Sequence, residues 1–159
     1  GLLSHAPALT ALCTSTSNGY GRFRPNAMAP QSILWGRDNR GAMLRVVGGA
    51  GDGATRIENR LGEPAANPYL TMAAQIHAGI DGLRRHLQPP PATEAPYAEG
   101  GDKIPTTLGD ALTALQADAA LVDGFGADVV NHFCRIKQQE LDRRLQQTPP
   151  GNSQDVSSA

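Results

Sequence analysis

Three charged side chains alternate along a short segment, at Arg56, Glu58 and Arg60. If the segment is a β-strand, the three side chains share one face, because successive residues point to opposite faces and alternate residues lie about 7 Å apart. Two interpretations of this face are open. It is a solvated ladder of ion pairs, which adds little stability, or it is a site at which Glu58 binds a hard cation and the arginines bind phosphate or carboxylate.

Other arginines favour the binding interpretation. Arg45 lies on the segment that we expect to pair with this strand, Arg40 precedes it by five residues, and Arg22 lies in a loop beside glycines. The guanidinium of arginine is a planar fork that binds carboxylate or phosphate through two hydrogen bonds. Five arginines around one carboxylate are poorly compensated, so they indicate a strongly anionic partner.

The charge of the chain is divided unevenly. Residues 1–60 hold seven arginines and three acidic residues, whereas residues 61–159 hold seven basic and twelve acidic residues, and the net charge is −1. An arginine-rich nucleic-acid module is the less favoured alternative, because aromatic side chains, on which bases stack, form only 4% of the chain. A nucleotide together with a small carboxylate substrate fits better, and we expect no nucleic acid partner.

Two strand-like segments position these side chains. Residues 41–47 and 55–61 have the length of strands, and the glycine-rich loop 48–53 separates them. The pattern predicts a hairpin over residues 42–61. The glycines are not followed by Gly-Lys-Ser/Thr, so the loop is not a phosphate-binding P-loop. Across a hairpin, the two strands can bring their arginines close together.

Helices are predicted after the hairpin. The first begins at Asn67, a good N-cap, with Pro68 at the first helical position, and it ends before the prolines at 89–91. The second begins at residue 107 and ends at about 122, and the third covers about 128–145. The apolar residues expected to face inward are Leu70, Ala73, Ala74, His77, Ile80, Leu83 and Leu87 in the first helix, Leu108, Ala111, Leu112 and Leu115 in the second, and Val129, Phe133, Ile136 and Leu141 in the third.

Length and composition bound the class of protein. The 159 residues have the length of one domain, and no run approaches the roughly twenty apolar residues that a membrane span requires. We therefore expect no membrane segment. Cys13 and Cys134 have no metal-binding spacing and form no disulfide framework, so we expect reduced thiols and a cytoplasmic protein.

The predicted fold is α+β, with an antiparallel hairpin followed by about three helices. Residues 1–146 are expected to form the domain, and residues 147–159, which lack an apolar face, are expected to form a disordered tail. The first forty residues show no clear period. The proline-rich segment 88–105 is expected to be a surface excursion.

Several short segments of the chain together resemble one known protein family. They are residues 1–10, 18–23, 29–30, 35–40, 45, 56–60 and 64–69. In this order they resemble the C-terminal part of the glutamine synthetase catalytic domain. The resemblance implies an ATP-dependent ligase, in which ATP phosphorylates the γ-carboxylate of glutamate and ammonia or an organic amine attacks the acyl phosphate. It also implies a ring-shaped homo-oligomer and Mg²⁺ or Mn²⁺ as cofactor.

The resemblance implies roles for the charged residues by position. Glu58 is implied to be a ligand of a divalent metal ion. Arg22 and Arg60 are implied to contact glutamate. The arginines implied to gather the transferred phosphate and the nucleotide phosphates are Arg40, Arg45 and Arg56, of which the first two are implied to be catalytic.

The chain departs from the family pattern in its extent. The family's N-terminal domain, its other metal-binding carboxylates and its metal-binding histidine would all lie upstream of Gly1. None of the histidines present occupies the position of the metal-binding one. We therefore expect the chain to be a fragment that does not catalyse alone.

A second departure lies at Met28. In the family a glutamate precedes Ala-Pro in a flap that closes the site and helps to take a proton from ammonium, whereas here Met28 precedes Ala29 and Pro30. Because methionine is apolar and flexible and takes no proton, it suits the packing of an alkyl or aryl group. Two interpretations are open: the substitution is a harmless one in a loop, or, as we favour, it indicates an organic amine as the substrate in place of ammonia.

The alternative to an enzyme is a non-catalytic glutamine-synthetase-like protein that keeps the fold for binding or assembly. Tyr97 lies near the position where some bacterial members of the family carry an adenylylated tyrosine, but its flanking sequence departs from theirs. We therefore expect Tyr97 to be a plain surface tyrosine.

Overall fold

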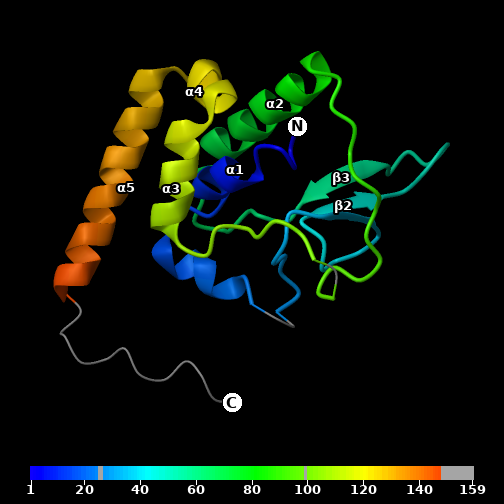
Figure 1. Ribbon diagram of the computed structural model, residues 1–159, viewed down its shortest axis with the longest axis horizontal. Coiled ribbons are helices and arrows are strands. Elements are labelled where there is room, and N and C mark those ends of the chain that lie inside the picture. The colour runs from blue at the N-terminus through cyan, green and yellow to red at the C-terminus, as the bar shows by residue number, and fades with distance from the viewer. Residues whose placement is uncertain (25–26, 99, 148–159) are drawn as a thin grey trace.

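The computed structural model describes residues 1–24, 27–98 and 100–147 of the chain (Figure 1). Helices gather on one side and a small sheet lies on the other, so the predicted α+β class is confirmed. In chain order the elements are α1 (Ala6–Cys13), the 3₁₀ helix η1 (Ser17–Arg22), β1 (Trp35–Arg37), β2 (Leu44–Val47), β3 (Arg56–Asn59), α2 (Pro68–Arg84), α3 (Leu108–Ala117), α4 (Ala119–Phe125) and α5 (Ala127–Gln147).

The predicted hairpin is present and belongs to a sheet of order β1-β2-β3. β2 and β3 pair antiparallel, with Arg45 opposite Glu58, and both are shorter than the predicted segments 41–47 and 55–61. β1 pairs with β2 in parallel orientation. The sequence does not predict β1, because three residues carry too little alternation to show a strand.

The predicted start of α2 is confirmed. The Asn67 side chain accepts hydrogen bonds from two backbone N–H groups of the first turn, and Pro68 is the first helical residue. The helix ends at Arg84, slightly before the predicted end near residue 87. At the other end of the chain, α5 continues to Gln147, and the rest of the tail predicted over 147–159 lies outside the described residues.

The single helix predicted over residues 107–122 is instead two helices. Thr107 caps α3 as expected, by accepting a hydrogen bond from the Asp110 N–H. The chain then bends at Asp118, whose side chain accepts a hydrogen bond from the Leu121 N–H and so caps α4. An aspartate is a strong N-cap, and here it begins a new helix inside an otherwise continuous apolar pattern.

α1 lies in the region where the sequence shows no clear period. Most of its residues are buried: Ala6, Ala8, Leu9, Thr10, Ala11, Leu12 and Cys13. A helix that is buried on nearly all sides has no polar face, so it shows no amphipathic pattern. α1 packs against α2 and α3 and lies at the centre of the core.

α2 buries a narrower face than the one predicted. Its buried positions are the small residues Ala74, Ala78 and Gly82. Ile80 and Leu83, which were predicted to face inward, are 37% and 76% exposed, so that part of the prediction is wrong. The two residues belong to an exposed apolar stripe along the helix, formed by Tyr69, Met72, Ile76, Ile80 and Leu83.

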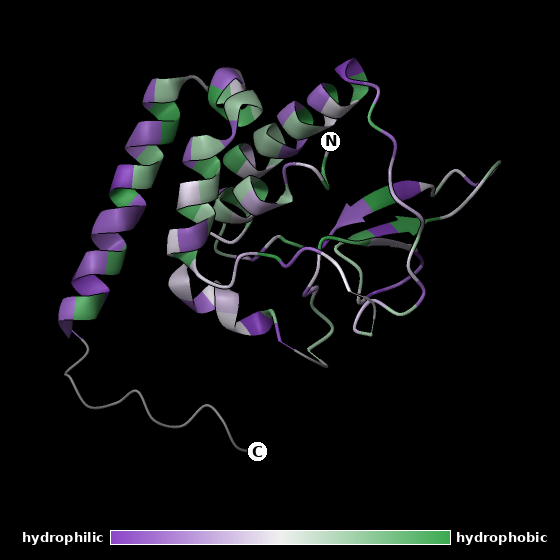
Figure 2. Cartoon of the chain, viewed as in Figure 1, coloured by the Kyte–Doolittle hydropathy of each residue, from purple (hydrophilic) through white to green (hydrophobic). Residues whose placement is uncertain are grey.

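The later helices differ in how much they bury. The inward face predicted for α3 is confirmed at Leu108, Ala111, Leu112 and Leu115. α5 is mostly purple in Figure 2 and buries Val130 and Cys134, whereas Val129 and Ile136, predicted to face inward, are exposed. Within the described part of the chain, no helix has the length and apolar character needed to cross a membrane.

Residues 88–98 form a proline-rich strap beside the edge strand β1. The backbone N–H of Thr93 donates to the Trp35 carbonyl at 2.8 Å, and the Asn39 side chain donates to the Glu94 carbonyl at 3.1 Å. Figure 1 shows the strap descending from the end of α2 past the sheet. The predicted surface excursion is therefore bonded to the sheet at several points.

Candidate anion-binding site

Glu58 lies between two arginines on the face of the hairpin. Its carboxylate accepts hydrogen bonds from Arg45 Nη1, at 3.1 Å, and from Arg60 Nη1. Arg45 lies directly opposite Glu58 in the strand register, and it also donates to Asp38 through Nε, at 3.0 Å, and through Nη2. The result is a row of alternating charges that runs from Asp38 through Arg45 and Glu58 to Arg60.

These hydrogen bonds shift the pKa values of Asp38, Arg45 and Glu58, so that each side chain stays in its charged form. The hydrogen bond from Arg60, followed by that from Arg45, lowers the pKa of the Glu58 carboxyl. The hydrogen bond from Arg45 likewise lowers the pKa of Asp38, and the bond to Asp38 raises the pKa of Arg45. Both carboxylates are therefore ionised at neutral pH.

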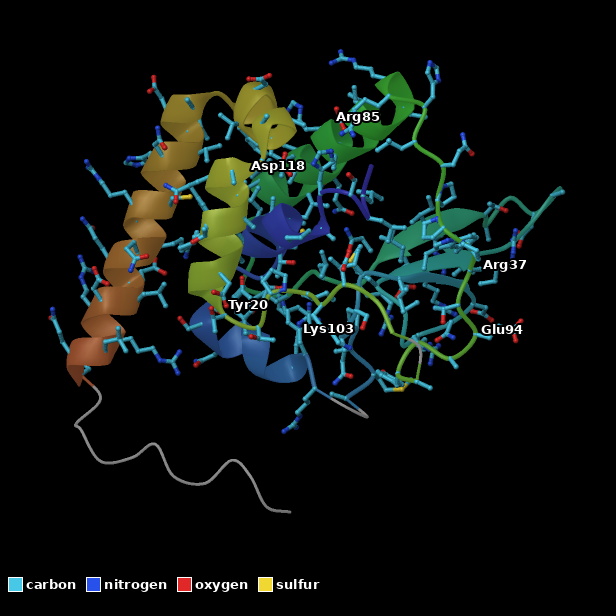
Figure 3. The ribbon with its side chains drawn as sticks, viewed as in Figure 1. Tyr20, Arg37, Arg85, Glu94, Lys103 and Asp118 are labelled. Atoms are coloured by element: carbon cyan, nitrogen blue, oxygen red, sulfur yellow. The ribbon has the colours of Figure 1, made fainter. Side chains whose placement is uncertain are left out.

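A cavity of about 620 Å³ opens between the connection from β1 to β2 and the proline-rich strap. Its lining residues are Arg37, Asp38, Asn39, Arg40, Arg45, Ala92, Thr93 and Glu94. Figure 3 labels Arg37 and Glu94 on this side of the molecule. Three arginines outnumber two acidic side chains in the lining, so the cavity suits an anionic group.

Two of the predicted site arginines make other contacts. Arg56 is exposed and donates to the Ala54 carbonyl at 3.0 Å, and no hydrogen bond among the described residues joins it to Glu58. Arg22 donates through Nη2 to the backbone carbonyls of Arg60 and Leu61, and burial lowers its pKa. Arg22 thus supports the chain directly after β3, close to the row of charges.

Several buried polar atoms have no hydrogen-bond partner within the described residues. They are Nε of Arg22, Nε of Arg60, Nδ2 of Asn59 and Oγ1 of Thr93. Buried polar groups of folded proteins are nearly always paired, so unpaired donors point to a missing acceptor. Two of these atoms belong to the guanidinium groups of Arg22 and Arg60, which lie at the end of β3.

Met28 lies next to this site through its backbone. Arg60 Nη2 donates to the Met28 carbonyl at 2.6 Å, while another nitrogen of the same guanidinium binds Glu58. The Met28 side chain is 55% exposed. The structure therefore brings together Arg45, Glu58, Arg60 and Met28, places Arg40 at the cavity, and leaves Arg56 at the edge.

Sequence reasoning missed several residues of the site. Asp38 was not predicted, although it compensates Arg45, and neither was Arg37, which lies over the Trp35 ring with its guanidinium carbon 6.0 Å from the ring centroid. Asp38 has a positive φ of 47° in the turn after β1. An Asp-Asn pair is a turn signal, but it does not reveal which strand the turn serves.

The residues present can supply only part of a metal site. Glu58 offers ionised oxygens, which suit a hard cation. Within the described residues, however, no group of three or more histidine, cysteine, aspartate or glutamate side chains could hold a metal ion. Glu58 can therefore be one ligand of a site whose other ligands lie outside the described residues.

The chain is similar in sequence to known proteins of one family. The family model for the glutamine synthetase catalytic domain matches residues 1–153. The chain is 41% identical over 146 residues to a γ-glutamylanilide synthase of Acinetobacter sp., covering 91% of this chain and 29% of that protein. It is 40% identical over 149 residues to a glutamine synthetase of Halobacterium salinarum, covering 88% of this chain and 33% of that protein.

Solved structures share the fold. A GmaS–ADP complex matches with a TM-score of 0.81 and 31% identity over 94% of this chain and 36% of that chain. A ligand-free GmaS structure matches with a TM-score of 0.81 and 34% identity over 94% of this chain and 34% of that chain.

The family model and the shared fold identify the chain as part of a glutamine-synthetase-type catalytic domain. The chain belongs to the glutamine synthetase family, which confirms the resemblance found in the sequence. It spans about a third of the length of the curated relatives named above.

Proposed function

We propose that the protein carrying this chain is an ATP-dependent ligase that joins the γ-carboxylate of glutamate to an organic amine, with ammonia as the alternative substrate. One observation carries the proposal: Arg60 binds both Glu58 and the backbone of Met28. The positions proposed for the metal, glutamate and the amine therefore adjoin one another. A relative named γ-glutamylanilide synthase supports an amine that bears carbon.

The proposed reaction has two steps. A γ-carboxylate oxygen of glutamate bonds to the terminal phosphorus of ATP, and ADP leaves. The amine nitrogen then bonds to the acyl carbon, phosphate leaves, and a group other than Met28 takes the amine proton. Phosphoryl transfer depends on positioning and on neutralising charge, which arginines supply.

Different arginines are proposed to bind glutamate and the phosphates of ATP. Arg22 and Arg60, with their unpaired buried donors, are proposed to bind glutamate. The arginines proposed to bind the phosphates are Arg40, Arg45 and Arg56. Arg40 lines the cavity and attracts the Asp38 carboxylate, but it makes no ion pair at contact distance among the described residues, so its guanidinium can receive a phosphate. Arg45 has to exchange one of its carboxylate contacts before it can bind one.

The proposed cofactor is Mg²⁺ or Mn²⁺, with Glu58 as one ligand. Such a cation neutralises charge on ATP when it is bound. Both Glu58 oxygens now accept hydrogen bonds from arginines, so a cation would replace at least one of these contacts. The family resemblance also leads us to propose a ring-shaped homo-oligomer in the cytoplasm.

Phosphate release from ATP by the full-length protein tests the proposal. We expect release that requires glutamate together with an amine or ammonium, and we expect Glu58→Gln to abolish it. The matched control is Glu140→Gln on α5, where the carboxylate pairs with Lys137, away from the site. Absence of release with every amine, in both Mg²⁺ and Mn²⁺, would instead favour a non-catalytic protein that uses the fold for binding or assembly.

A further inference from the structure

The loop that carries Met28 is held from two sides. Met28 has a φ of 52°, in the left-handed region that residues other than glycine seldom adopt. Its carbonyl accepts a hydrogen bond from Arg60 Nη2 at 2.6 Å, and the next carbonyl, that of Ala29, accepts one from the Tyr97 hydroxyl at 3.4 Å. A backbone conformation of this kind persists only where its surroundings enforce it.

Tyr97 is itself held against the sheet by the strap. A Cβ atom on Gly41 would lie 2.9 Å from Tyr97 Cε2 and 2.7 Å from Pro96 Cγ, so the strap lies in close contact with the backbone before β2. The strap is also tied to β1 by the hydrogen bond from the Thr93 N–H to the Trp35 carbonyl. Tyr97 is 41% exposed, as expected of a surface tyrosine, but one edge of its ring lies against Gly41 and its hydroxyl reaches the Met28 loop.

We propose that Tyr97 is a positioning residue for Met28. Its hydrogen bond to the Ala29 carbonyl holds the loop in the conformation from which the exposed Met28 side chain packs against the amine. The inference rests on the proposed function, since it gives Tyr97 a part in the choice of amine. Without the hydroxyl, the hydrogen bond to Ala29 is lost and the apolar contact of Met28 weakens. The hydrogen bond from Arg60 to the Met28 carbonyl does not involve Tyr97, so the contacts proposed for glutamate and ATP stay in place.

The substitution Tyr97→Phe tests this in the full-length protein, because it removes the hydroxyl and keeps the ring. We expect the KM for the amine to rise about twofold to tenfold, the effect of one hydrogen bond, with kcat and the KM for glutamate unchanged. The matched control is Tyr69→Phe on α2, where the side chain is 78% exposed, and it should change nothing. A joint change of kcat and every KM in Tyr97→Phe would indicate a general structural role and would overturn the inference.

A second readout does not depend on turnover. In the same variant the ¹³C-methyl NMR signal of Met28 should move, whereas the signals of buried Met43 and of Met72 on α2 should not. An unmoved Met28 signal overturns the inference, and so does a moved signal with an unchanged KM for the amine. If the unmodified protein releases no phosphate with any amine, the proposed function fails, and the Met28 signal still decides whether Tyr97 holds the loop.

Discussion

At the scale of single residues, Arg60 connects Glu58 with the loop that carries Met28. One of its nitrogens donates to Glu58 and another donates to the Met28 carbonyl, while its Nε is buried without a partner in the described structure. A planar guanidinium can hold several acceptors in fixed directions at once, whereas a lysine ammonium on a flexible stem cannot reproduce that geometry. The identity of this residue, beyond its charge, should therefore matter for activity.

The substitution Arg60→Lys tests this point. We expect kcat/KM for glutamate to fall about tenfold to hundredfold, because charged hydrogen bonds of this kind typically contribute about 1.5–3 kcal/mol. The measurement is phosphate release by the full-length protein as a function of glutamate concentration. Arg84→Lys, at the exposed end of α2, is the control and should leave the kinetics unchanged. Unaltered glutamate kinetics in Arg60→Lys would remove Arg60 from the proposed site.

At the scale of elements, one histidine joins three helices. His5, the residue before α1, lies with Nδ1 2.7 Å from Asp118 Oδ2 and with Nε2 2.8 Å from Asp81 Oδ2. Asp81 belongs to α2, where it also pairs with Arg85 at 3.0 Å, and Asp118 caps α4. Figure 3 labels Arg85 and Asp118 around the start of α1. This cluster joins the start of α1, the last turns of α2 and the start of α4 on the helical side of the molecule.

The cluster makes stability depend on pH in a defined direction. The hydrogen bond with His5 is the main cause that lowers the pKa of Asp81 below its ordinary value of 3.8, with Arg85 adding to it. A carboxyl whose pKa is lower in the folded state stabilises the fold above its ordinary pKa, and this contribution is lost as the pH falls through the lowered value. Asp81→Asn should therefore lower the Tm at pH 7 and have progressively less effect below about pH 4.

Thermal unfolding between pH 7 and pH 3 measures this effect. Asp142→Asn on α5, where the carboxylate meets only Gln138 in the described structure, is the control and should shift the Tm little at any pH. A constant difference between Asp81→Asn and the unmodified protein across this range would contradict the assignment of the lowered pKa to Asp81.

The sequence predicts those parts of the fold that local signals determine. Asn67 with Pro68, and Thr107, mark helix starts that the structure confirms, and the glycine-rich loop marks the hairpin that places Arg45 opposite Glu58. α1 is hidden from pattern analysis because it is buried on nearly all sides. Asp38 is hidden for another reason: it reaches Arg45 through the parallel pairing of β1 with β2, a contact that no local pattern encodes.

At the scale of the whole molecule, the described structure holds features of an incomplete site. Unpaired buried donors surround β3, Glu58 has no further metal ligands beside it in the described structure, and an apolar stripe on α2 is exposed. A buried polar group without a hydrogen-bond partner costs free energy. A large apolar patch that faces water marks a surface that other chains or ligands cover. The chain also spans only about a third of the length of the curated relatives named above.

These features predict that the 159 residues alone do not turn over ATP. Phosphoryl transfer of this kind requires metal ions held by several ligands, and no group of three or more suitable side chains among the described residues could hold one. The measurement is glutamate-dependent phosphate release by the purified 159-residue chain, with the full-length protein as the positive control. Measurable glutamate-dependent release from the chain alone would show that it carries a complete site.

Met28 is the residue on which the proposed choice of amine depends. Ammonium, like an alkylammonium ion, must lose a proton before it can attack, and a missing base typically costs a factor of about 10²–10⁴ in rate. Methionine supplies no base, and no acidic residue lies within nine positions of Met28 along the chain. An organic amine gains from apolar packing, by about 0.8 kcal/mol for each buried CH₂ group.

The most direct test compares kcat/KM for ammonium and for a series of alkyl- and arylamines in the full-length protein, with glutamate and ATP present. We predict that an amine that bears carbon gives the highest value, and that Met28→Glu raises the value for ammonium relative to that amine. Met72→Glu, on the exposed face of α2, is the matched control and should leave the ratio unchanged. If ammonium gives the highest kcat/KM in the unmodified protein, the account of Met28 is contradicted and the enzyme is an ordinary glutamine synthetase.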